Sequence, residues 1–313
     1  MRYLLGVLAG ILSGLAFTAS SIAQKRAINA LGTEAQLFRS LVKSPLWLAG
    51  FAAAFVIGAP LNMAAYMAIG PTLPPALNSI GLAAIPILAR IFLGERSPVR
   101  SYAGAVVMAL AVACIGLSGV AIAPESVNWV DSGFLLRAAM AVACVLGVSM
   151  AFIWSGLHSR SSGTTSLALA AGAAQALTNA LMAPIAGQIG RLFSGNLGLT
   201  GFIIAGVTSV ALAAVNFGAI AIGQLALRKG AVVVVIPLQQ LPIQVVPLVF
   251  HIALYGGNFG TPAETAFLAL GLVFLIAGSI ALGGARTSPR GKVPAMANCL
   301  VVMCHAVPLF SLI

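Results

Sequence analysis

Charged residues make up only 7% of this chain of 313 residues, whereas hydrophobic residues make up 60%. The surface of a soluble domain needs several times more charge than that. The scarcity excludes a soluble protein, and apolar runs of about 18 or more residues recur along nearly the whole length. The sequence therefore predicts an all-α polytopic membrane protein that lies in the lipid bilayer.

Acidic residues are the scarcest charged type, with five Asp and Glu against 16 Lys and Arg. A net charge of +11 would suggest nucleic acid as the partner of a soluble protein. Here the bases flank apolar runs, so no nucleic-acid partner is expected. We expect neither an enzyme nor a cofactor, because no paired carboxylate lies at depth and neither a Ser-His-Asp set nor a phosphate-binding loop is present. The acids fall in connecting segments or at helix ends: Glu34, Glu95, Glu125, Asp131 and Glu264.

Cysteine is also rare, and the four copies are too scattered for a disulfide framework. Cys114 and Cys144 lie inside apolar runs, whereas Cys299 and Cys304 lie near the C-terminus beside His305. The spacing of this last group matches no strong ligand motif, so the metal ligands, if any, stay unknown.

Nine apolar runs have the length of a membrane-spanning helix. The first imitates a secretory signal peptide, but strong positive charge follows it rather than precedes it, so we interpret it as a spanning helix. The segment 296–313 is apolar but short, which leaves two alternatives for residues 286–313, a basic cytoplasmic tail or a truncated tenth helix. The nine runs are residues 3–23, 46–70, 73–93, 102–122, 134–157, 166–186, 201–225, 231–254 and 265–284.

The positions of Lys and Arg predict the orientation of the chain. They gather in the segments that follow runs one, three, five, seven and nine, which by the positive-inside rule are cytoplasmic. The N-terminus is then outside, the C-terminus is cytoplasmic, and the cell (plasma) membrane is the expected location. In residues 24–45 apolar and basic residues alternate at helical spacing, which is typical of an amphipathic helix on the cytoplasmic surface, and a solvated connector is the alternative.

A weak internal repeat is found at an offset of 161 residues, where Asn78 matches Gln239 and Pro86 matches Pro247. It divides the chain into a first repeat at 1–123, a connecting helix within 124–165 and a second repeat at 166–285. Because one odd helix separates the halves, the second copy inserts upside down. That is the inverted-repeat architecture of secondary transporters, whose substrate site lies near the membrane midplane.

Prolines interrupt the third and eighth runs, which are equivalent in the two repeats. Pro75 and Pro86 lie in the third run, and Pro237, Pro242 and Pro247 in the eighth. An interior proline frees the carbonyl four residues before it, and such carbonyls are tolerated in lipid only where they face protein or a wet cavity. The freed carbonyls are expected at Leu82, Val233, Leu238 and Ile243.

Polar side chains gather in the same runs and complete the candidate substrate site. Amides at spanning depth also bond one helix to another, and this packing role is the alternative for each of them. On the eighth run Gln240, Gln244 and His251 share a narrow stripe, which favours a site there. The other candidates are Asn62, Tyr66, Asn78, Asn216 and Gln224, and the sixth run adds an i, i+4 pair, Gln175 and Asn179.

The order of these features resembles the NIPA family of magnesium transporters, a branch of the drug/metabolite transporter superfamily that also contains the EamA-type exporters. The resemblance covers roughly residues 3–284, and its most specific parts are Asn-Met-Ala-Ala-Tyr at 62–66 and Phe-Leu-Gly-Glu-Arg at 92–96. It implies a drug/metabolite transporter fold and magnesium as substrate. The chain departs from the family at 58–60, where Gly-Ala-Pro stands in place of the glutamate that the family usually carries.

Two classes of function follow. The first is a transporter that moves magnesium, another divalent cation or a small polar metabolite through a midplane cavity lined by the second, third, seventh and eighth runs. The missing glutamate favours the metabolite, whereas the family resemblance favours magnesium. The alternative is a non-transporting membrane partner or assembly subunit with the same fold. A homodimer is a further open alternative for the partner.

Overall fold

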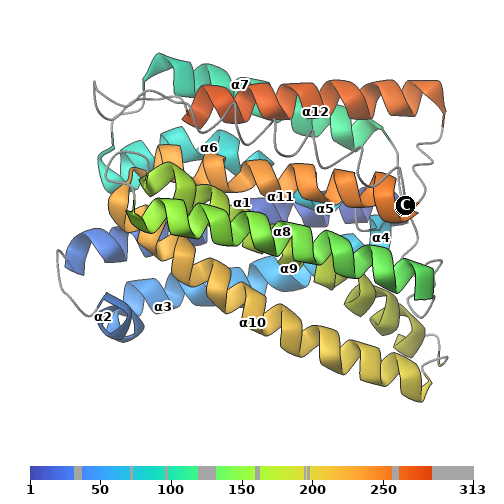
Figure 1. The fold of residues 1–313 in the computed structure, drawn as a ribbon. Coiled ribbons are helices and arrows are strands. Elements are labelled where there is room, and N and C mark those ends of the chain that lie inside the picture. Colours follow the sequence, from blue (N-terminus) through green and yellow to red (C-terminus); the bar gives the residue numbers. More distant parts are fainter. Residues whose placement is uncertain are drawn as a thin grey trace.

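Helices are the only regular elements in the described part of the computed structural model (Figure 1). That part comprises residues 1–31, 37–70, 73–95, 98–118, 132–158, 163–193, 195, 198–255 and 261–283. Within it six helices are long and apolar enough to cross a membrane, and two shorter apolar helices accompany them. The chain is therefore an integral membrane protein of the all-α polytopic class. The six are Arg2–Ala30, Pro45–Ile69, Leu73–Leu93, Leu136–His158, Leu199–Lys229 and Pro262–Ala281, and the shorter two are Val99–Ile115 and Val232–Pro247.

Each of the nine predicted runs is helical over most of its length. The elements of the first part are α1 (Arg2–Leu31), α2 (Leu37–Lys43), α3 (Pro45–Ala52), η1 (Ala53–Gly58), α4 (Ala59–Ile69), α5 (Leu73–Leu77), α6 (Ile80–Leu88), η2 (Ala89–Leu93) and α7 (Val99–Leu117). Those of the second part are α8 (Ser132–His158), α9 (Gly163–Phe193), α10 (Leu199–Lys229), α11 (Val232–Tyr255) and α12 (Pro262–Gly283). The predicted tail or tenth helix, the side chain of His251 and the Cys299, Cys304 and His305 group lie outside the described residues.

The segment expected on the membrane surface, 24–45, is divided between two helices. Residues 24–31 continue α1, and a short separate helix, α2, follows at Leu37–Lys43. Leu41 of α2 is fully buried, and α2 packs against α1 and α3. This part of the segment is thus held by protein contacts.

Local sequence explains where α3 begins and where the π-helix η1 that follows it ends. Ser44 caps α3, because its Oγ accepts a hydrogen bond from the backbone N of Trp47 at 3.4 Å, and Pro45 occupies the first turn, where no amide hydrogen is needed. The π-helix η1 ends just before Pro60, whose missing amide hydrogen interrupts the regular α pattern. Helices α3, η1 and α4 together form one continuous rod from residue 45 to residue 69.

The third predicted run is a discontinuous helix. A turn at Asn78 and Ser79 separates α5 from α6, whereas α11 continues through its three prolines. The turn lies against α1 at Gly14, where an added Cβ would come within 2.1 Å of the Asn78 carbonyl oxygen. In the other half, α11 approaches α9 in the same way, because a Cβ at Gly172 would lie 2.1 Å from the carbonyl oxygen of Gln239.

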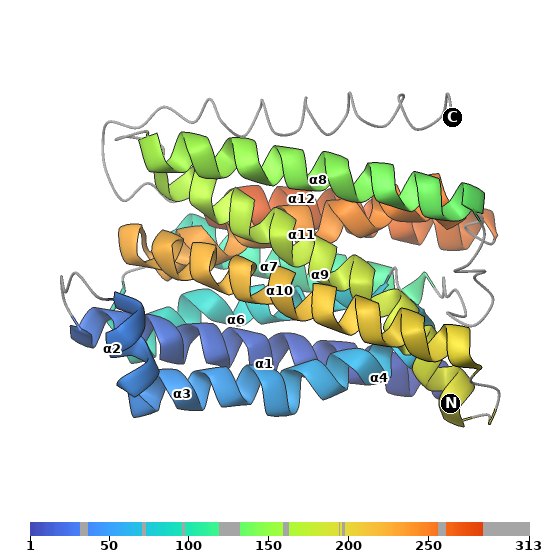
Figure 2. The same cartoon turned by 60° about the horizontal axis from the view of Figure 1, so that its bottom comes forward.

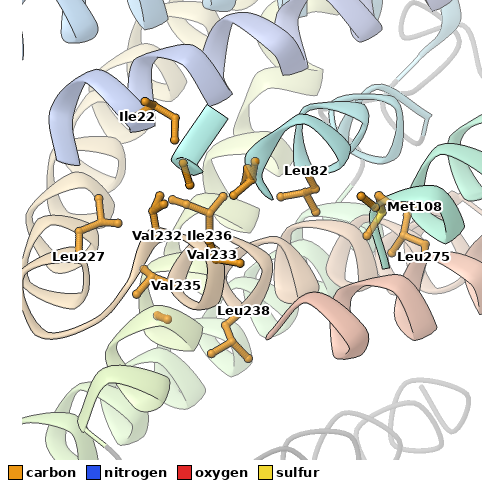
Figure 3. Packing of buried hydrophobic residues seen from close by; sticks show 14 of the residues in the cluster. Ile22, Leu82, Met108, Leu227, Val232, Val233, Val235, Ile236, Leu238 and Leu275 are labelled. Atoms are coloured by element: carbon orange, nitrogen blue, oxygen red, sulfur yellow. The ribbon is translucent and has the colours of Figure 1, made fainter. Parts of the chain in front are cut away.

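The helices pack in two groups that share a core. Helix α1 contacts α3, η1, α4 and α6, and α9 contacts α8, α10 and α11, while α7 lies along α12 (Figures 1 and 2). The main hydrophobic cluster joins both groups through α1, α6, α10 and α11 and continues to α7 and α12. Figure 3 shows Met108 of α7 beside Leu275 of α12, and Val232 and Ile236 of α11 between α1 and α10.

Gly94 ends η2 in the left-handed region, with φ of 67°, and an added Cβ there would contact nothing within 4 Å. Gly94→Ala is therefore expected to destabilise the protein by about 1 kcal/mol through backbone strain alone. Gly94→Asn should lose less, since asparagine tolerates this conformation. Thermal unfolding in detergent measures both, with Gly147→Ala in α8 as the control, because that site is equally open but helical. Equal melting temperatures for Gly94→Ala and the control would contradict the assignment.

Candidate substrate cavity

A cavity of about 320 Å³ lies between the two groups of helices. One wall comes from α1, α3, η1, α4 and the start of α6, and the other from α9, α10 and α11. Its size is within the lower range of small-molecule sites. The two close contacts, of Gly14 with Asn78 and of Gly172 with Gln239, position this cavity. Gly14, Asn78 and Gln239 all line it.

The lining is mostly apolar with many uncharged polar groups, and none of its described residues is ionisable. It combines carboxamides and hydroxyls with three phenyl rings, Phe17, Phe51 and Phe55. Phe51 and Phe55 stack with ring centroids 4.3 Å apart, one turn from each other along the rod of α3 and η1. The carboxamides are Gln24, Asn62, Asn78, Gln175, Asn179, Asn216, Gln224, Gln239 and Gln240, and the hydroxyls are Thr18, Ser20, Ser21 and Thr178.

Hydrogen bonds order part of this lining and leave oxygens free. The Asn78 amide donates to Asn62 Oδ1 at 3.0 Å. The Gln224 amide donates to Gln24 Oε1, and the Gln24 amide donates to Ser20 Oγ at 3.0 Å. Three buried oxygens of the lining have no hydrogen-bond partner: Asn78 Oδ1, Gln224 Oε1 and Gln240 Oε1.

Seven of the polar residues predicted from the sequence line the cavity. They are Asn62, Asn78, Gln175, Asn179, Asn216, Gln224 and Gln240. The two other polar candidates lie elsewhere. Tyr66 is fully buried in a cluster with Met182 and Ala186, and Gln244 is buried and donates to Ser79 Oγ.

The prolines predicted as part of the site do not line it. Pro75 is buried in α5, Pro86 is inside α6, and Pro237, Pro242 and Pro247 are inside α11. However, Leu82 and Ile243, the residues four positions before Pro86 and Pro247, do line the cavity. The other two residues with expected freed carbonyls, Val233 and Leu238, are buried in the main core.

Helices α1 and α9 contribute lining that the expected set of four runs omits. Helix α1 supplies Thr18, Ser20, Ser21 and Gln24, and α9 supplies Gln175, Thr178 and Asn179. The signal in α1 was a group of hydroxyls followed by an amide within two helical turns. We assigned Gln24 to the surface segment because the basic residues after it indicated a helix end.

The two ends of the cavity differ. Toward the start of α1, Tyr66 packs against Met182 and Ala186, with Met63, Met67 and Leu212 around them. Toward the end of α1, the ammonium of Lys25 is buried and donates to the backbone oxygens of Leu227 and, at 3.0 Å, Gly230, where α10 ends. Such a cation is favourable at a helix C-terminus.

Glu95 completes this second end. Its Oε1 accepts a hydrogen bond from the backbone N of Val232 at 3.5 Å, at the first residue of α11, where a negative charge is favourable. Glu95 is also the carboxylate that acts electrostatically on Lys25. Basic and acidic side chains therefore stabilise the ends of α10 and α11 next to α1.

Many lining residues occur in pairs at one of two constant separations along the chain. Six pairs are separated by 161 residues: Phe51 and Leu212, Phe55 and Asn216, Ala59 and Ile220, Asn62 and Gly223, Asn78 and Gln239, Leu82 and Ile243. Between α1 and α9 four pairs are separated by 158 residues: Phe17 and Gln175, Ser20 and Thr178, Ser21 and Asn179, Gln24 and Met182. The glycines at the close contacts, Gly14 and Gly172, have the same separation of 158 residues.

Comparison of the chain with protein-family models, with curated proteins and with solved structures gave no match.

Proposed function

We propose that this protein is a secondary transporter of the drug/metabolite type, which moves a small polar solute through the cavity between two inverted repeats. The observation that carries the proposal is the set of uncharged amides and hydroxyls that both halves contribute to the lining. Three pairs, Asn78 and Gln239, Ser20 and Thr178, and Ser21 and Asn179, are polar at both positions. Transporter sites lie near the midplane at the interface of such repeats. The nine spans and the outside N-terminus belong to the same proposal.

The helix contacts support the inverted repeat. Helix α1 packs on α4 and α6 as α9 packs on α10 and α11. Helix α7 packs on α6 as α12 packs on α11, and α7 and α12 pack on each other. Helix α8 is then the unpaired connector, and one unpaired span between the halves inverts the second of them.

An asymmetry between the halves supports alternating access. Gln224, Leu227 and Ile236 line the cavity, whereas the residues 161 positions before them, Met63, Tyr66 and Pro75, do not. The cavity thus reaches further toward the end of α1, the end we propose to be cytoplasmic. If the two halves exchanged their arrangements, the opposite end would open around Tyr66.

The donor set favours a polar metabolite over magnesium. A divalent ion that has lost its water needs oxygen ligands, normally with carboxylates among them. In the described part of the chain, no residue that lines the cavity bears a carboxylate. Magnesium would have to pass largely hydrated, held by amide oxygens, and it stays in the proposal only through the family resemblance.

Two glutamines on α11 test the cavity as the transport path. The expected result in proteoliposomes is that Gln240→Leu reduces solute uptake at least tenfold, because Gln240 lines the cavity. Gln244→Leu should retain uptake and lose thermal stability instead, by about 1–2 kcal/mol, because Gln244 bonds to Ser79 away from the cavity. The assay uses magnesium and a panel of amino acids and other small polar metabolites.

The same assay separates transport from the non-transporting alternative. No flux for any solute, together with a partner protein that co-purifies stably, would overturn the transporter proposal. Uptake that Gln240→Leu leaves unchanged in a well-folded variant would return Gln240 to a packing role.

A further inference from the structure

We infer, on the basis of the proposed transport function, that the cavity recognises a neutral polyhydroxylated solute of about the size of a monosaccharide. Four properties of the lining lead to this class of substrate: its free hydrogen-bonding atoms, its lack of charge, its apolar wall and its volume.

The free atoms are hydrogen-bond acceptors that lack a donor. Asn78 Oδ1, Gln224 Oε1 and Gln240 Oε1 are buried without partners, and such an atom destabilises a protein by about 1–3 kcal/mol. These atoms have almost no accessible surface where they lie, so a ligand hydroxyl would donate to one of them, and offset that loss, once the carboxamide turns toward the cavity. Hydroxyl groups also accept, so they match carboxamides, which carry a donor and an acceptor on one planar group.

The absence of ionisable groups from the described lining residues selects against charged solutes. Among these residues an anion, such as a phosphorylated sugar, would find no Lys or Arg, and a cation would find no carboxylate. An ion that leaves water without a countercharge loses much of its hydration free energy. A neutral solute loses only its hydrogen bonds to water, and the nine carboxamides of the lining replace them.

The phenyl rings supply an apolar part of the wall that α1, α3 and η1 form. Phe51 and Phe55 come from α3 and η1, and Phe17 comes from α1. A polyol has an apolar side made of its C–H groups, and its burial against these rings is favourable. Ligand sites commonly combine an apolar wall with a few polar groups that fix the orientation of the ligand.

The volume of the cavity, about 320 Å³, favours a small solute. A monosaccharide or a hexitol, with about a dozen non-hydrogen atoms, suits a pocket at the lower end of the range for small-molecule sites. Nucleotides and disaccharides are about twice as large.

Uptake and binding are measured in parallel to test this class. Radiolabelled glucose, ribose and sorbitol are compared with glycine, choline and magnesium in proteoliposomes, and the same compounds are tested for thermal stabilisation of the purified protein. At least one of the three polyols should be taken up and should raise the melting temperature. Gln240→Leu and Gln224→Leu should each reduce both effects at least tenfold in apparent affinity.

Gln188→Leu is the matched control. Gln188 of α9 is a buried glutamine whose Oε1 also has no partner, but it does not line the cavity. Its replacement should leave polyol uptake and binding unchanged. Gln240→Glu adds a second test, since it keeps the size of the side chain but introduces charge, and it should weaken polyol binding while allowing choline to bind.

The outcomes distinguish this inference from the proposed function. Uptake of glycine, choline or magnesium but of no polyol would overturn the inference and leave the transporter proposal intact. Polyol binding that depends on Gln240, without flux of any solute, would support the inference and overturn transport. If the polyols were neither bound nor taken up, the inference would be overturned. It would also be overturned if Gln188→Leu lost as much binding and uptake as Gln240→Leu.

Discussion

Gly14→Ala and Gly172→Ala are each expected to destabilise the protein by about 3 kcal/mol, which lowers its melting temperature by roughly 5–10 °C. The reason is steric. The new Cβ would lie 2.1 Å from a backbone oxygen, of Asn78 in one case and of Gln239 in the other. Backbone cannot rotate away as a side chain can, so α1 would have to separate from the α5–α6 turn, and α9 from α11.

Gly206→Ala and Gly218→Ala are the controls for this prediction. Both lie in the interior of α10, where an added Cβ meets nothing within 4 Å. Alanine favours a helix over glycine by about 1 kcal/mol, so these variants should unfold at the same temperature as the parent or slightly higher. Thermal unfolding in detergent gives all four values.

The comparison between the two variants also tests the repeat. Equivalent contacts should give similar losses at Gly14 and Gly172. A loss at only one of them would contradict the equivalence of the halves, and no loss at either would contradict the close helix contacts themselves.

Lys25→Met is expected to destabilise the protein by about 2–4 kcal/mol. Methionine keeps an unbranched side chain but removes the ammonium. The backbone oxygens of Leu227 and Gly230 would then lose their donor at the end of α10, and Glu95 would lose the cation that faces it. The measurement is again thermal unfolding, with limited proteolysis to detect opening between α1 and α10.

A double-mutant cycle isolates the electrostatic part of this effect. In the Lys25→Met background, Glu95→Gln should recover part of the lost stability, because it removes the uncompensated carboxylate. Arg26→Met is the control, since Arg26 is the exposed neighbour and its replacement removes the same charge. If Lys25→Met and Arg26→Met behaved alike, Lys25 would have no role at the end of α10.

Hydropathy predicted where the helices lie but not where they end. The first run was expected to stop near residue 23 because Lys25 and Arg26 follow it, yet α1 continues to Leu31. Lys25 can stay in the helix and be buried because α10 ends beside it and offers carbonyl oxygens. That partner is about 200 residues away in the chain, so no local pattern indicates it.

The lining of the cavity was predicted in part, for a similar reason. Helical spacing identified polar positions of the second, sixth and eighth runs, but it does not tell which neighbour a buried polar face meets. Gln240 and Gln244 share a stripe on α11, yet one lines the cavity and the other bonds to Ser79. The side chain of Tyr66, one turn after Asn62, lies in a packed cluster with Met182. The prolines of the third and eighth runs indicated helices that do contribute to the cavity. The residues four positions before two of these prolines are among the lining residues.

The uncharged lining has an electrical consequence. The membrane potential does work only on charge that moves across it, about 2.3 kcal/mol per elementary charge for each 100 mV. In the proposed cycle the lining residues that would move between the two arrangements bear no charge, and neither would a polyol. Such a step is electroneutral, and the concentration gradient of the solute alone sets the direction of net movement.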